Sequence, residues 1–108
     1  MASVQLDGRA IPDWDAFHRE SRTVFGFPDF YGCNMSAWID CLSGLRDDDG
    51  MSRFVLAPDE TLDIELLHAA VLRRRAPHIL EALEECVGEV NQRYREHGEA
   101  EALRLLLR

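Results

Sequence analysis

The strongest constraint on the fold is the order in which two kinds of hydrophobic pattern follow one another. Apolar side chains occupy every second position at residues 3–6, 62–66 and 103–107, which is typical of strands. Between these stretches the apolar residues recur at helical spacing. Strands separated by helices favour parallel pairing, because each connection must cross back over the sheet. We therefore predict a small α/β fold.

Two helices are predicted between the first and second strand patterns. The first runs from about Asp13 to Phe25, because Pro12 and Asp13 are typical of a helix start. The second follows Asn34, which can act as its N-cap, and ends near residues 43–44. Its apolar residues recur at helical spacing and are Met35, Trp38, Ile39, Leu42 and Leu45.

Two further helices are predicted before the last strand. A short one begins at Leu67 and is interrupted at Pro77, because proline lacks the N–H that a helix interior needs. A longer one follows and ends at His97-Gly98. Its apolar stripe consists of Ile79, Leu80, Leu83, Val87, Val90 and Tyr94.

The region between the second helix and the middle strand allows two interpretations. A short β-like run at residues 53–56 meets Pro58-Asp59, and the clearer alternation at 62–66 follows. The pattern predicts either a hairpin over residues 53–66 or one bent strand.

Neither repeats nor linker-like stretches interrupt the 108 residues, so we expect a single domain over residues 1–108.

The charge balance restricts the classes of partner. Twenty acidic residues against 12 basic ones give a formal net charge of −8, which repels nucleic acid and favours encounter with cationic proteins. Solvation alone is the alternative explanation of the acid excess.

With no stretch of 18 apolar residues and no apolar N-terminal segment, the sequence predicts neither membrane insertion nor export.

The cysteines and histidines offer little for catalysis or metal binding. Cys33, Cys41 and Cys86 form no zinc-type pair, and their odd number argues against a disulfide framework, so we expect a reducing cytoplasm. Cys41 with His18 or His68 would be a thiolate and base, but its place beside the apolar stripe favours a buried structural role. The four histidines are scattered over separate predicted elements, so we expect no metal site. Common enzyme motifs are absent, and we expect no cofactor.

An aromatic loop at residues 26–32 leads into the second helix. Its continuation, FPDFYGCNMSAWIDCLSGL, resembles the loop and second helix of the barstar family, which have the pattern P-x-Y-Y-G-x-N-x-D-A-x-x-D-C-L-x-G. The likeness extends without a gap back to Leu6 and loosely forward through the later elements. The resemblance implies a small two-layer α/β fold in which helices pack on a three-stranded parallel sheet.

The resemblance also implies a function. Barstar-like proteins protect the producing cell by plugging the active site of a secreted ribonuclease with the second helix and the preceding loop. For this chain it implies an intracellular immunity protein, not an enzyme, that binds a basic extracellular ribonuclease or related toxin one to one. The contacts would lie in loop 27–33 and helix 34–44. The alternative is an intracellular interaction or regulatory module that keeps this fold without inhibiting a ribonuclease.

The likeness assigns the expected contacts residue by residue. Asp40 stands where the family has the carboxylate that enters the enzyme's phosphate site, and Tyr31, Gly32 and Asn34 also match. The full set of candidate contacts is Phe30, Tyr31, Gly32, Asn34, Met35, Ser36, Ile39 and Asp40.

Several positions depart from the family pattern. Phe30 replaces a tyrosine, Ser36 replaces an acidic residue, and Ile39 replaces a tryptophan. In the long helix, an acidic family position aligns at or near Arg93, which reverses the charge. Residues 53–60 form an additional segment, an expected hairpin or edge strand that would widen the interface or cap the sheet.

Overall fold

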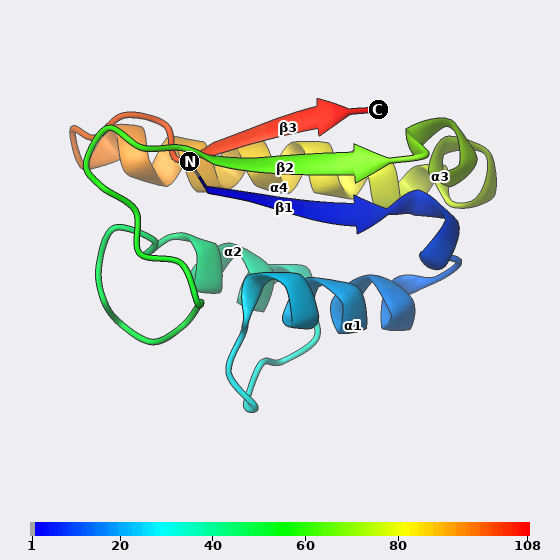
Figure 1. Cartoon of the computed structure of the whole chain (residues 1–108), viewed down its shortest axis with the longest axis horizontal. Helices are drawn as coiled ribbons and strands as arrows, with labels where there is room; N and C mark the ends of the chain where they lie inside the picture. Colours follow the sequence, from blue (N-terminus) through cyan, green and yellow to red (C-terminus); the bar gives the residue numbers. More distant parts are fainter. Residues whose placement is uncertain (1) are drawn as a thin grey trace.

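Three parallel strands form one sheet in the order β1-β2-β3, as the computed structural model shows for residues 2–108 (Figure 1). The strands pair in register, so that Val4 lies opposite Ile64 and Ile64 lies opposite Leu105. The elements are β1 (Ala2–Asp7), the 3-10 helix η1 (Gly8–Ala10), α1 (Trp14–Phe25), α2 (Met35–Leu42), β2 (Leu62–Leu67), α3 (Ala69–Arg75), α4 (Pro77–Glu96) and β3 (Leu103–Leu107). The predicted three-stranded α/β fold is confirmed.

The two faces of the sheet have different surroundings. Val4, Leu6 and Ile64 are buried in the core, where α1 packs against β1 and α4 against β3. On the other face, the Asp63 carboxylate accepts two hydrogen bonds from Arg104, of 3.0 and 2.8 Å. One packed face and one polar face make the protein a two-layer structure.

The starts of α1 and α2 agree with the sequence prediction. The side chain of Asp13 accepts a hydrogen bond from the backbone N–H of Ala16 at 2.9 Å, and Asn34 does the same for Ala37 at 2.8 Å. These bonds satisfy amides that have no partner within their helices. Gly26 ends α1 in the left-handed conformation, with φ of 69°, which costs glycine little.

One boundary prediction is wrong. The short helix begins at Ala69, because Leu67 is the last residue of β2 and His68 turns the chain with φ of 54°. Leu45 lies beyond the end of α2, although its side chain is buried as its place in the apolar stripe predicts.

Neither the hairpin nor the single bent strand predicted for residues 53–66 forms, and residues 53–60 do not form an edge strand. In this segment β2 is the strand that forms, and the backbone before it pairs with the end of α1 and with the turn that follows α2. Arg53 N–H donates to the Phe25 carbonyl at 2.9 Å, and Leu56 N–H donates to the Leu45 carbonyl at 2.7 Å. These partners occupy the donors that a second hairpin strand would need.

The side chain of Arg46 holds this irregular segment in place. It is only 7% exposed, and its guanidinium donates to the carbonyls of Ala57, Glu60 and Ala100 at 3.2, 3.0 and 2.6 Å. Its guanidinium carbon also lies 5.2 Å from the centre of the Tyr94 ring. One cation thus joins the chain after α2 to the chain before β2 and before β3.

Tyr94 of α4 binds the C-terminal end of α2. Its hydroxyl accepts a hydrogen bond from the Leu45 N–H and donates one to the Leu42 carbonyl, both at 2.8 Å. Tyr94 is 3% exposed, so these groups have little access to water. This single hydroxyl therefore satisfies two backbone groups, one at the end of α2 and one just after it, and joins them to α4.

Removing that hydroxyl with Tyr94→Phe is expected to lower the free energy of unfolding by about 1–3 kcal/mol. The physical reason is that the Leu42 carbonyl and the Leu45 amide would both lose a buried partner. Urea denaturation of the variant and the parent measures the difference. An unchanged unfolding midpoint would show that these groups find other partners.

Candidate functional site

The eight expected contact residues lie along one continuous segment, the loop between α1 and α2 followed by α2 itself (Figure 1). They differ in exposure. Gly32, Asn34, Ser36 and Asp40 are exposed, and Met35 and Ile39 are half-buried. Phe30 is 75% exposed, whereas Tyr31 is 7% exposed. Neighbouring residues of the motif therefore have different physical roles.

The aromatic loop is built around an internal cluster. The rings of Phe27 and Tyr31 lie 4.7 Å apart, and Phe25 stacks on Phe27 at 5.2 Å. The Tyr31 N–H donates to the Pro28 carbonyl at 3.0 Å, which closes the turn. Because Phe27 and Tyr31 are directed into the core, Phe30 is left as the exposed aromatic side chain of the loop.

His18 of α1 anchors the loop through Tyr31. Its Nδ1 lies 2.7 Å from the Tyr31 hydroxyl, and the His18 side chain is buried. Burial lowers the pKa of His18, an effect that Asp15 opposes, and burial raises the pKa of Tyr31. The tyrosine thus stays protonated at neutral pH and the histidine favours its neutral form, which allows the hydroxyl to donate to the ring. Sequence reasoning missed this role, because no local pattern links residues 13 positions apart.

Helix α2 has a buried face and an exposed face. Trp38, Cys41 and Leu42 are buried in the core. Ser36 and Asp40 are four residues apart, so they share the opposite face, which is open to solvent. The helix therefore presents a carboxylate outward while its apolar side fixes its orientation.

The carboxylate of Asp40 has a partner within the chain. Arg93 of α4 donates from Nη1 to Asp40 Oδ1 at 2.8 Å and to Ser43 Oγ at 3.3 Å. The side chains of Asp40 and Arg93 remain 63% and 42% exposed. The sequence likeness placed Arg93 near this surface, but the pairing with Asp40 follows from the packing of α2 on α4.

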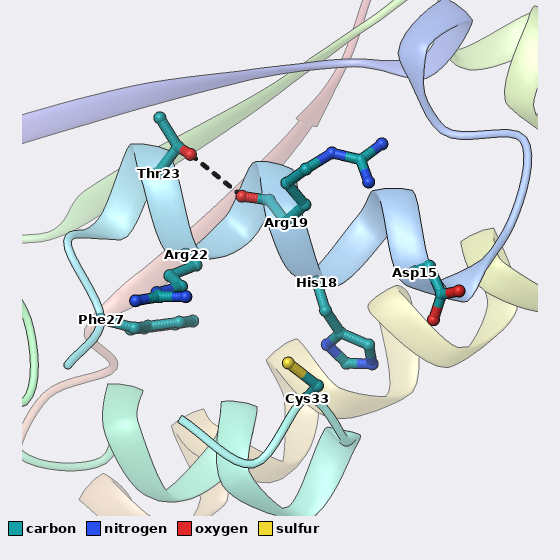
Figure 2. Close-up of a pocket in the computed structure, with 7 residues that line it drawn as sticks. All are labelled: Asp15, His18, Arg19, Arg22, Thr23, Phe27 and Cys33. Carbon is teal, nitrogen blue, oxygen red and sulfur yellow. Dashed lines mark hydrogen bonds between the residues drawn. The ribbon is translucent and has the colours of Figure 1, made fainter. Parts of the chain in front are cut away.

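A hollow of about 370 Å³ borders the loop on its α1 side (Figure 2). Arg22 at its edge forms an ion pair with Asp29 at 2.7 Å, and Cys33 of the loop closes one wall. The hollow places the positive charges of Arg19 and Arg22 beside the loop. Its lining residues are Asp15, His18, Arg19, Arg22, Thr23, Phe27 and Cys33.

The cysteines do not form the thiolate and base pair considered from the sequence. His18 uses its Nδ1 for Tyr31, and Cys41 lies on the buried face of α2. Burial, with smaller effects of Asp40 and Asp49, raises the pKa of Cys41, which keeps its thiol protonated at neutral pH. The structural role favoured for Cys41 agrees with this placement.

Neither a metal cluster nor a membrane span is found in the part of the chain that the structure describes. Across residues 2–108, no three His, Cys, Asp or Glu side chains come close enough together to hold a metal ion. None of the helices in this range combines the length and the apolar character needed to cross a bilayer.

Comparison with known proteins identifies the family. The family model described as barstar (barnase inhibitor) matches residues 1–106. The chain belongs to the barstar family. A relative from Bacillus subtilis (strain 168), named "Putative ribonuclease inhibitor YrdF", is 36% identical over 47 residues. These residues are 44% of this chain and 52% of the relative, so the match spans about half the length of that protein. Barstar proteins are inhibitors rather than enzymes, which supports a barnase-inhibitor-like role at the level of the family.

The burial of His18 makes the stability of this barstar protein depend on pH. Because the pKa of His18 is lowered on folding, the unfolded chain takes up this proton first as the pH falls below about 6.5. The stabilising contribution is complete above that pH and is lost between it and the lower pKa of the folded state. Urea denaturation at pH 7.5 and 5.0 should therefore show a larger loss of stability for the parent than for His18→Gln. Equal losses would contradict the role of His18.

Proposed function

We propose that this protein is an intracellular immunity protein that binds a basic secreted ribonuclease one to one and blocks its active site. The loop at residues 27–33 and the outer face of α2 make the contact. The observation that carries the proposal is the 63% exposed carboxylate of Asp40, presented outward by a helix whose other face is buried. Membership of the barstar family supports this proposal.

Charge supplies the first part of the recognition. A ribonuclease binds a polyphosphate, so its active site must be cationic, and a carboxylate on a rigid helix can take the place of a phosphate. The net charge of −8 and the exposed run Asp47–Asp49, which follows α2, steer a cationic enzyme toward this surface. The same charge disfavours direct contact with nucleic acid, and we propose no membrane partner.

Apolar contact supplies the second part. Phe30 is 75% exposed above a rigid aromatic cluster, so it can bury a ring against the enzyme without ordering the loop first. Tyr31 supports this loop from inside, since its hydroxyl is held by His18. Gly32, Asn34 and Ser36 provide exposed polar contacts around Asp40, and Met35 and Ile39 provide a half-buried apolar border.

The state of the cysteines fits the proposed cytoplasmic location. Cys33, Cys41 and Cys86 are all free, and Cys33 is exposed. Exposed thiols persist in reducing compartments, where disulfides are rare. An inhibitor in the cytoplasm would meet its ribonuclease before the enzyme is exported.

A second function is favoured by one observation. Asp40 is already paired with Arg93, which suits an intracellular interaction or regulatory module that no longer inhibits a ribonuclease. Affinity capture from the native cytosol separates the two functions. Recovery of a nuclease supports the immunity role, and recovery of regulatory or metabolic proteins alone supports the second.

The Asp40→Ala variant tests the immunity role. Inhibition of a panel of basic bacterial extracellular ribonucleases is titrated at low and physiological salt. We expect stoichiometric inhibition by the parent and an inhibition constant at least tenfold weaker for the variant, about 1.4 kcal/mol. The reason is that the cations of the enzyme would be left desolvated without an anionic partner.

Asp59→Ala is the matched control, because it removes the same charge from an exposed position outside the proposed contact. Its inhibition constant should change by less than about threefold, mainly through the association rate. If both variants weakened the inhibition constant equally, Asp40 would contribute only through general electrostatic steering. A correctly folded Asp40→Ala variant that inhibits as well as the parent would exclude Asp40 from the contact.

A further inference from the structure

Arg93 is held against α2 by two acceptors. Its Nη1 donates to Asp40 Oδ1 at 2.8 Å and to Ser43 Oγ at 3.3 Å, while the Ser43 hydroxyl itself donates to the Ile39 carbonyl at 2.6 Å. The guanidinium is therefore positioned by the last turn of α2 and by the residue that follows it. It forms part of the same surface as Asp40.

The backbone beneath this pair is also fixed. Tyr94, the next residue of α4, binds the Leu42 carbonyl and the Leu45 amide through its hydroxyl. Arg93 thus cannot leave Asp40 through a shift of α4 without breaking buried hydrogen bonds. The pair can instead open by rotation of the exposed side chains of Arg93 and Asp40.

Arg93 has an acidic neighbour on its own helix that it does not use. Glu89 lies one turn earlier on α4, at a spacing that commonly supports an ion pair. Within residues 2–108, the ion pair that Arg93 forms is with Asp40 and not with Glu89. The contact between helices, and not charge pairing along α4, therefore determines where the guanidinium lies.

The pairing of Arg93 with Asp40 changes the charges that a binding partner contacts on this surface. In the free protein the exposed pair contributes little to stability, because water screens both charges. A partner that covers the surface removes this water, so cations brought to Asp40 would also face the positive charge of Arg93. Either this repulsion weakens the complex or a carboxylate of the partner must pair with Arg93.

We propose that Arg93 determines the specificity of this surface, selecting a basic ribonuclease that carries a carboxylate beside its cationic phosphate site. The inference rests on the proposed function and names the charge pattern of the partner. An enzyme with cations alone is bound weakly, because Arg93 competes with it for Asp40. An enzyme with the additional carboxylate pairs with both side chains.

A charge exchange across the interface tests this specificity. The probes are two forms of one basic ribonuclease from the inhibition panel. One form carries a glutamate and the other a glutamine at a single position within about 8 Å of the phosphate-binding cations, which is roughly the screening length at physiological salt. The parent protein should bind the glutamate form at least tenfold more tightly, and Arg93→Glu should reverse this preference.

Arg95→Glu is the matched control. Arg95 lies on the same helix with a similarly exposed side chain, 46% against 42%, and it pairs with Glu101 instead of α2. Both substitutions change the formal net charge by the same amount, from −8 to −10. The preference of Arg95→Glu between the two ribonuclease forms should equal that of the parent within about threefold, since general electrostatics act on both variants alike.

A measurement without a partner tests the ion pair itself. Nitrogen-detected NMR of the arginine side chains should show a change at Arg93, and not at Arg95, when Asp40 is replaced by Asn. An unchanged Arg93 signal would overturn the inference, because the arginine would then not be held by Asp40.

The outcomes separate this inference from the function on which it rests. Asp40→Ala could lose inhibition while Arg93→Glu and Arg95→Glu have the same preference between the two ribonuclease forms. In that case the specificity role of Arg93 is overturned and the immunity role stands. If neither the parent nor any variant inhibits a ribonuclease, the proposed function fails and the inference fails with it. A reversal of preference confined to Arg93→Glu supports both.

Discussion

Helix α2 ends inside the protein at Leu42, whose buried carbonyl takes its hydrogen-bond partner from another element. Tyr94 of α4 provides that partner through one hydroxyl, which binds both the Leu42 carbonyl and the Leu45 amide. Arg46, packed over the Tyr94 ring, then joins the following chain to the segments before β2 and β3. The orientation of α2, and with it the exposure of Asp40, depends on this junction.

The candidate site results from the same packing. With Trp38 and Leu42 in the core, α2 must present Asp40 to solvent, and the contact with α4 brings Arg93 beside it. The preceding loop also has a buried and an exposed side, because Tyr31 is directed inward to His18 while Phe30 is exposed to solvent. A rigid surface with a carboxylate and one exposed aromatic ring is suited to recognising a preformed cationic cleft.

Local sequence patterns predicted most of the fold. The alternating runs became the three parallel strands, and Asp13 and Asn34 cap the helices they were expected to begin. The hairpin over residues 53–66 was not formed, because the amides of Arg53 and Leu56 bind carbonyls at the ends of other elements. A run of four residues with β-like composition cannot show which distant carbonyl groups will be available to it.

The sequence by itself determined the class of fold, the starts of α1 and α2, the membership of the barstar family and the place of Asp40 in the family motif. These features follow from hydrophobic period, capping residues and a contiguous motif, all of which act over a few turns of chain. The tertiary structure alone decided that His18 holds Tyr31 and that Arg93 holds Asp40. Each of these contacts joins residues on different elements, 13 and 53 positions apart, so only the packing of the elements brings them together.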